Sequence, residues 1–180
     1  LAGWLNVIGL DILTAIKLTQ TFGFIGVALA LYGWTRRHFS KPGAWLAAIA
    51  YTFASFHMVN VYTRGDSLSE FYAFVFYPLI LWSLEATFER RAARSILALA
   101  LSFGGLFVAH NLSAFIFSVC VIPLYIVIRA AYALAARSTH SHLFSSLIAC
   151  AAGLVLGLAL SAWVWMPFTF EKDYAQLGEQ

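Results

Sequence analysis

A short charged segment between two apolar runs holds the residues best suited to chemistry. The segment covers residues 61–71 and contains Arg64, Asp66 and Glu70. A guanidinium is a good ligand for a phosphate group, and a carboxylate can take a proton from a hydroxyl group. The residue types therefore favour a binding or catalytic loop at this point of the chain.

A purely structural interpretation of the same residues stays open. Arg64 and Asp66 can form a solvated pair that contributes little energy. Glu70 can be the acid favoured in the first turn of a helix, with Ser67 or Ser69 as its N-cap. Gly65 fits a turn residue that tolerates positive φ.

The composition places these residues in a membrane protein. Of the 180 residues, 62% are hydrophobic and 11% are charged, and the mean hydropathy is +0.81. A soluble domain carries about 25% charged residues, so the low charge argues against one. The net charge of +3 does not indicate nucleic-acid binding, because the basic residues form short clusters between apolar runs.

The apolar runs predict an all-α, polytopic transmembrane helix bundle that forms one domain over residues 1–180. Runs long enough to cross about 30 Å of hydrocarbon recur along the whole chain. Pro78 lies inside one run, where it should free a backbone carbonyl and kink the helix. We expect about six spans, at residues 12–34, 43–62, 70–88, 95–109, 112–135 and 143–168.

Small residues and cysteines give further expectations about packing. Gly153 and Gly157 have the GxxxG spacing that allows two helices to approach closely, which favours packing within the bundle. Cys120 and Cys150 fall inside apolar runs, where a thiol usually behaves as a small hydrophobic group.

The charges of the connections between spans predict an orientation. The first, third and fifth connections are basic, whereas the second is mixed and the fourth is uncharged. The positive-inside rule therefore places the first, third and fifth connections in the cytoplasm and both termini outside it. One further span before Leu1 would suit that arrangement, so we expect a longer chain. The first connection contains Arg36, Arg37 and Lys41. The third contains Arg90, Arg91 and Arg94, with Glu85 and Glu89 nearby, and the fifth contains Arg137, with Arg129 nearby.

This orientation gathers many polar residues at the non-cytoplasmic end. Ionisable residues at membrane depth are costly and often mark a functional site. No paired metal-binding motif accompanies His57 or His110, so we expect no metal site and no chlorin ligation, and packed histidines are the alternative. The gathered residues are Lys17, His57, Asn60, Arg64, Asp66, Glu70, His110, Asn111, Glu171 and Asp173.

The region 51–84 resembles the bacterial membrane proteins called 6-pyruvoyl-tetrahydropterin-synthase-related, through the pattern YxRGDSLSEF followed by YPLILW. That family is placed in the GT-C superfamily of multispanning glycosyltransferases, and its pterin name implies no pterin chemistry. The resemblance extends over about residues 11–175. Its other elements are His110-Asn111, and then Trp163, Trp165, Pro167 and Glu171.

The resemblance implies transfer of a sugar from a polyprenyl-phosphate donor at the non-cytoplasmic face of a bacterial inner membrane. Such enzymes carry a catalytic acid in the first outer loop, after their first span. The sequence has no clear counterpart of this acid, because that region would precede Leu1, unless Asp11 fills the role. Asp66, Glu70 and Glu171 are then candidate catalytic carboxylates. The candidate substrate-binding residues are Arg64, Lys17, His57, His110 and Asn111.

A non-enzymatic alternative stays open. It is an accessory subunit, bound to membrane lipids and to other membrane subunits of a larger respiratory or photosynthetic complex. We expect no cofactor on either hypothesis. On the glycosyltransferase hypothesis, the lipid-linked sugar would be the donor substrate.

Overall fold

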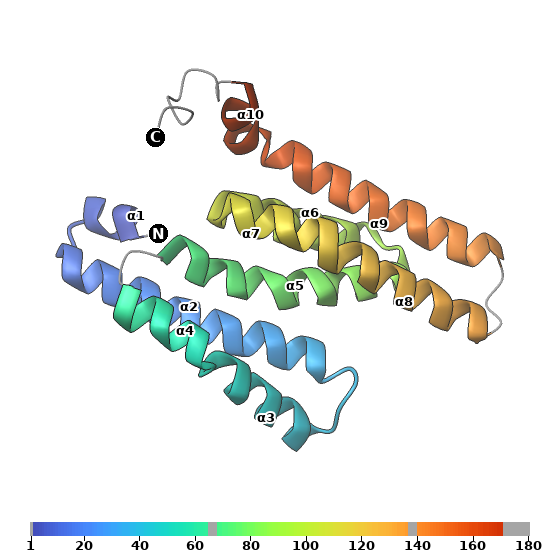
Figure 1. Cartoon of the computed structure of the whole chain (residues 1–180), viewed down its shortest axis with the longest axis horizontal. Coiled ribbons are helices and arrows are strands. Elements are labelled where there is room, and N and C mark those ends of the chain that lie inside the picture. Colours follow the sequence, from blue (N-terminus) through green and yellow to red (C-terminus); the bar gives the residue numbers. More distant parts are fainter. Residues whose placement is uncertain (1, 65–67, 137–139, 171–180) are drawn as a thin grey trace, which may run out of the picture. The chain divides into compact units, whose positions relative to one another are not determined.

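A computed structural model describes residues 2–64, 68–136 and 140–170 of the chain. The described residues form helices joined by short turns and contain no strand (Figure 1). The prediction of an all-α polytopic bundle is therefore confirmed. The helices are α1 (Ala2–Val7), α2 (Ile12–Thr35), α3 (Lys41–Thr52), α4 (Ser55–Val59), η1 (Asn60–Arg64), α5 (Leu68–Arg90), α6 (Ala93–Ala109), α7 (Asn111–Ile116), η2 (Phe117–Val121), α8 (Ile122–Ala135), α9 (His140–Leu160) and α10 (Ala162–Phe170).

Within the part of the chain that the structure describes, five helical segments are long and apolar enough to cross a membrane. The apolar helix α6 has 17 residues and is shorter than these segments. At 1.5 Å per residue it extends over about 25 Å, which is less than the hydrocarbon core of a bilayer. The spanning segments are Ile12–Thr35, Lys41–Thr63, Leu68–Arg90, Asn111–Ala135 and His140–Leu160.

The last expected span, 143–168, is divided into two helices. It breaks at Ser161, between α9 and α10. The buried Ser161 hydroxyl donates to the carbonyl oxygens of Gly157 at 3.0 Å and Leu158 at 3.1 Å. Such bonds from serine to the preceding turn bend helices, and they accompany the change of direction here. The second expected span, 43–62, is likewise divided, because α3 ends at Thr52 and α4 begins at Ser55.

The helix that contains Pro123 continues through a widened turn. In η2, the Ile122 N–H donates to the carbonyl of Phe117, five residues earlier. Pro123 follows at the start of α8. A proline cannot donate to the carbonyl four residues before it, and its ring crowds that carbonyl. A π-type turn is a known way to absorb this defect, so α7, η2 and α8 form one span.

The chain forms two compact units, Leu1–Pro78 and Leu79–Gln180. In the first unit α2 packs along α3 (Figure 1). The buried face of α2 repeats every four residues, at Ala15, Thr19, Gly23, Val27 and Leu31, which is the spacing of one helix face. The ring of Phe71 from α5 occupies the space where a side chain at position 23 would lie.

In the second unit α6 and α9 run side by side in the same direction (Figure 1). A β-carbon added at Gly157 would lie 2.7 Å from the Ala100 carbonyl oxygen, and one added at Gly104 would lie 2.9 Å from the Gly157 carbonyl oxygen. One added at Gly153 would meet Leu99 at 2.8 Å. The GxxxG spacing of α9 therefore brings two helix backbones into contact within the bundle.

Candidate functional site

Glu70 is the candidate carboxylate that the structure describes in the first unit. It lies in the first turn of α5 and is half-buried. A carboxylate at that position interacts favourably with the positive end of the helix dipole. Phe74, one turn later on the same helix face, is buried. Glu70 therefore sits at the end of a face that is packed against the rest of the unit.

The beginning of α5 is tied to α2 by a tyrosine. The Tyr72 hydroxyl donates to the Thr19 carbonyl oxygen at 2.7 Å. On the neighbouring face, Phe71 packs against Gly23 and its ring centroid lies 4.8 Å from that of Phe24. Because Phe71 and Tyr72 directly follow Glu70 in the chain, these contacts limit the movement of the first turn of α5.

A second tyrosine satisfies the carbonyl that Pro78 leaves without a partner in the helix. In an uninterrupted helix, the N–H of residue 78 would donate to the carbonyl of Phe74. Pro78 has no N–H, and the Tyr51 hydroxyl donates to the Phe74 carbonyl oxygen at 3.3 Å instead. The expected freed carbonyl is present, and α3 supplies its donor.

His57 lies within this aromatic group and is only 3% exposed. Its ring centroid is 4.1 Å from that of Phe74 and 4.7 Å from that of Tyr51. Its Nδ1 lies 3.4 Å from the Thr52 carbonyl oxygen, at the end of α3. The structure thus gives His57 a packing role, which is the alternative that the sequence leaves open.

Lys17 and Asp11 lie elsewhere on the unit. Lys17 is exposed on α2, two positions from both Ala15 and Thr19, and therefore on the face opposite the packed stripe. Asp11 is the N-cap of α2, where its Oδ2 accepts from the N–H groups of Leu13 at 3.1 Å and Thr14 at 3.4 Å. The carboxylate considered for a catalytic role therefore serves as a helix cap.

In the second unit, His110 and Asn111 form the junction between α6 and α7. The Nδ1 of His110 accepts from the Ser113 N–H at 3.2 Å and lies 2.8 Å from the Ser113 hydroxyl. An accepting Nδ1 assigns the ring proton to Nε2, which leaves Nε2 as a hydrogen-bond donor. The Oδ1 of Asn111 is buried and has no hydrogen-bond partner among the described residues.

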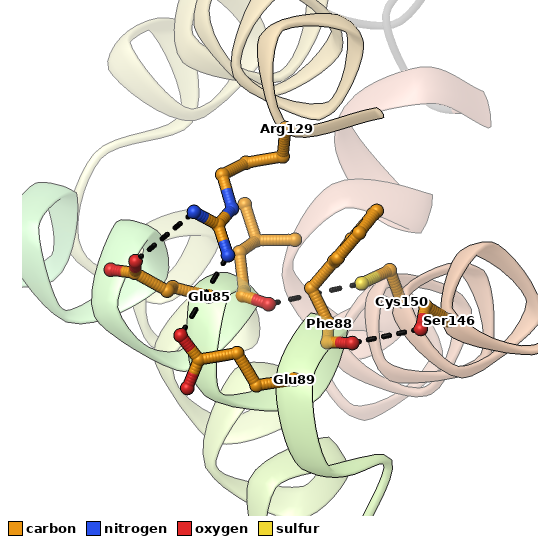
Figure 2. Close-up of polar contacts among 7 residues, drawn as sticks. Glu85, Phe88, Glu89, Arg129, Ser146 and Cys150 are labelled. Atoms are coloured by element: carbon orange, nitrogen blue, oxygen red, sulfur yellow. Dashed lines mark hydrogen bonds and ion pairs between the residues drawn. The ribbon is translucent and has the colours of Figure 1, made fainter. Parts of the chain in front are cut away.

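An ion-pair cluster lies where α5 ends beside α8. From the sequence, its members count only as charges in or near the basic connections, and their pairing is not predicted. Glu85 is 2% exposed and lies inside α5. Arg129 of α8 lies 3.5 Å from a Glu85 oxygen and 3.7 Å from a Glu89 oxygen, measured from its terminal nitrogens (Figure 2). Its guanidinium carbon is 5.8 Å from the centroid of the Phe88 ring, within cation–π range.

The same turns of α5 are bonded to α9. The Ser146 hydroxyl donates to the Phe88 carbonyl oxygen at 2.8 Å, and the Cys150 thiol lies 3.9 Å from the Leu84 carbonyl oxygen (Figure 2). The buried Cys150 fits the expectation for a cysteine in an apolar run, whereas Cys120 is exposed on the bundle surface. The arrangement holds α5, α8 and α9 together at one end of the unit.

The described candidate residues thus belong to different parts of the fold. Glu70 and His57 lie along one side of α5 in the first unit, although His57 is enclosed by aromatic rings. Lys17 faces away, and His110 and Asn111 belong to the second unit. Arg64 is the last residue of η1, whereas Asp66, Glu171 and Asp173 lie outside the described residues. Among the described residues, no group of three or more His, Cys, Asp and Glu side chains is placed to hold a metal ion.

These helices define an all-helical protein built to cross a membrane several times. The family model described as 6-pyruvoyl-tetrahydropterin synthase related domain, membrane protein, matches residues 1–176. The chain belongs to that family, as the pattern around Arg64 and Glu70 predicts. Comparisons with curated proteins and with solved structures found no match.

Proposed function

We propose that the chain takes part in transferring a sugar from a polyprenyl-phosphate donor, as expected of a glycosyltransferase of the GT-C type. The observation that carries this proposal is the position of Glu70. It is a half-buried carboxylate at the end of an apolar helix, and the hydroxyl of Tyr72 anchors that turn to α2. A general base must be held in place relative to the group that it deprotonates.

The chemistry assigns a role to each kind of side chain near this end of the unit. Glu70 accepts the proton of the acceptor hydroxyl as that oxygen attacks the anomeric carbon of the donor sugar, and the lipid phosphate leaves. The leaving phosphate requires a cation, for which Arg64 is the candidate, because Lys17 lies on the face of α2 opposite the packed stripe.

The test uses the purified chain with a polyprenyl-phosphate hexose, with donor binding followed by native mass spectrometry and sugar transfer by product analysis. We expect Glu70→Gln to keep donor binding and to lower transfer by about 100-fold or more, as for the loss of a general base. Arg64→Gln should weaken donor binding, because it removes a cation from the phosphate. Lys41→Gln, at the start of α3, is the charge control.

Retention of transfer by Glu70→Gln would exclude Glu70 as the base. Retention of donor binding by Arg64→Gln would exclude Arg64 as the phosphate ligand. Failure of the unmodified chain to bind the donor would exclude the proposal itself.

A second candidate function is a non-catalytic subunit of a larger membrane assembly. The observation that favours it is that three of the polar candidate residues make contacts within the chain. Asp11 caps α2, His57 packs between aromatic rings, and His110 caps α7. A subunit of this kind would not bind a lipid-linked sugar, so the same binding measurement separates the two functions.

A further inference from the structure

The connection between α5 and α6 combines several arginines with a short apolar helix. Arg90 ends α5, and Arg91 and Arg94 follow within the turn and the first residues of α6. All three side chains are exposed. The first turn of α6 contains no acidic residue, and the preceding acid Glu89 pairs with Arg129 at 3.7 Å. The turn therefore presents a concentrated positive charge.

The exposed face of α6 continues from these arginines as an apolar stripe. Leu97, Leu101 and Val108 are 49%, 58% and 50% exposed. Positions 94, 97, 101 and 108 follow the three-and-four spacing of one helix face. The opposite face holds the buried Leu99 and Leu106. One strip of the surface thus carries an arginine at its end and hydrocarbon along its length.

The length of α6 indicates where we expect this strip to lie in a bilayer. Its 17 residues give about 25 Å of helix, a few ångströms less than the hydrocarbon core. A short span is accommodated by local thinning of the bilayer and by long basic side chains that extend to the phosphates. We therefore expect Arg91 and Arg94 to lie at the depth of lipid phosphate groups.

We propose that this strip, comprising Arg90, Arg91 and Arg94 with Leu97, Leu101 and Val108, binds one anionic phospholipid. The guanidinium groups contact the headgroup phosphate, and one acyl chain lies along the leucines of α6. Arginine suits this role because its planar donors match phosphate oxygens. The site differs from the proposed sugar-donor site in its residues and in its unit of the fold.

The test compares phosphatidylglycerol with phosphatidylcholine of the same acyl chains, each added to the purified full chain in detergent. Native mass spectrometry measures the affinity of the first bound lipid. The unmodified chain should prefer phosphatidylglycerol, and Arg91→Gln/Arg94→Gln should reduce that preference on the order of tenfold, since each basic residue near an anionic surface contributes severalfold. Leu97→Ala/Leu101→Ala should weaken the binding of both lipids.

The matched control is Arg37→Gln/Lys41→Gln, which removes the same charge from the connection between α2 and α3. It should keep the preference for phosphatidylglycerol. Equal loss in the two double variants would show diffuse attraction and would overturn the proposal, as would an unchanged preference in Arg91→Gln/Arg94→Gln. Displacement of the lipid by millimolar inorganic phosphate would identify a soluble-anion site instead. Melting temperatures measured without added lipid show whether each variant is folded. The single variant Arg94→Gln tests the same site with a smaller change.

Discussion

At the scale of single residues, the polar side chains of this bundle are placed by the backbone groups that need partners. Asp11 accepts from two N–H groups at the start of α2, and Ser146 donates to the Phe88 carbonyl near the end of α5. Inside a membrane, an unpaired backbone group costs several kcal/mol. A hydrogen bond to the backbone can therefore explain a polar residue in such a chain without any role in substrate binding. Each candidate residue must be tested for this structural role.

Tyr51 and Pro78 provide such a test, because the tyrosine donates to the carbonyl that the proline leaves free. We expect Tyr51→Phe to lower the stability by about 1 kcal/mol, the usual net effect of leaving a buried acceptor without its donor. In the Pro78→Ala background the N–H restored at position 78 can donate to the Phe74 carbonyl, so Tyr51→Phe should then cost much less. Thermal unfolding of the four proteins in detergent measures this difference.

Equal losses of melting temperature in the two backgrounds would show that the Tyr51 hydroxyl does not act through the carbonyl that Pro78 leaves free. If Tyr51 stabilised the unit through ring packing alone, Tyr51→Phe would cause no loss in either background. The ring centroid of Tyr51 lies 4.7 Å from that of His57, and Tyr51→Phe retains this contact. The comparison therefore separates the hydroxyl from the ring.

At the scale of helices, α9 carries a buried face of small residues that meets two different neighbours. Ser146 and Cys150 bond to α5, whereas Gly153 and Gly157 lie against α6. Small residues give little hydrophobic driving force in lipid, so close packing and interhelical hydrogen bonds must hold such a helix in place. The two backbones approach each other closely at Gly157.

We expect Gly157→Ala to destabilise the second unit, and Gly157→Leu to do so more strongly. A β-carbon at position 157 would lie 2.7 Å from the Ala100 carbonyl oxygen and 3.1 Å from the Phe103 β-carbon. Relieving these contacts requires the backbones of α6 and α9 to separate, and overpacking of this kind costs about 1–3 kcal/mol. The melting temperature in detergent is the measurement. Gly3→Ala is the control, because a β-carbon there meets nothing within 4 Å, and an equal effect of the two alanines would contradict the packing argument.

The α5–α8 ion pair is the second interaction between helices that can be tested. Arg129→Gln removes the cation that lies 3.5 Å from Glu85, which is 2% exposed, and removing one partner of a buried pair costs about 3–5 kcal/mol. Glu85→Gln should cost less, because Arg129 keeps Glu89. The double variant should be more stable than the sum of the single effects predicts, with a coupling of about 1–3 kcal/mol. Additive losses in thermal unfolding would mean that the two side chains do not stabilise each other.

The sequence predicts where the helices lie along the chain better than it predicts which helices pack against each other. Apolar runs and prolines locate the helices, and the glycine spacing anticipates the contact of α9 with another helix of the bundle. Glu85 and Arg129 count among the charges near two basic connections, although both lie inside the expected spans 70–88 and 112–135. Their pairing depends on which helices are neighbours, and loop charge does not encode that. One signal is present, since Glu85 and Arg129 are opposite charges inside apolar runs. The packing of His57 depends on Tyr51 and Phe74, which come from two other helices.

At the scale of the whole molecule, basic and non-basic connections alternate along the chain. Arg36 and Arg37 precede α3, and Arg90 and Arg91 precede α6, whereas the connection between α6 and α7 contains no Lys, Arg, Asp or Glu. The bias of lysine and arginine towards the cytoplasm acts on short connections such as these. We therefore expect the starts of α3 and α6 to face the cytoplasm and the start of α5 to face the opposite side.

Accessibility of introduced cysteines tests this orientation in a background where Cys120 and Cys150 are replaced by alanine. Ser40→Cys precedes α3 and Ser69→Cys lies in the first turn of α5, and both serines are exposed and nearly isosteric with cysteine. A membrane-impermeant maleimide should label Ser69→Cys in intact cells, and should label Ser40→Cys only after the membrane is opened. The reverse pattern would invert the bundle and would place Glu70 at the cytoplasmic surface. A donor presented on the opposite side could then not reach this residue, so the same labelling experiment also decides whether Glu70 can act as the base.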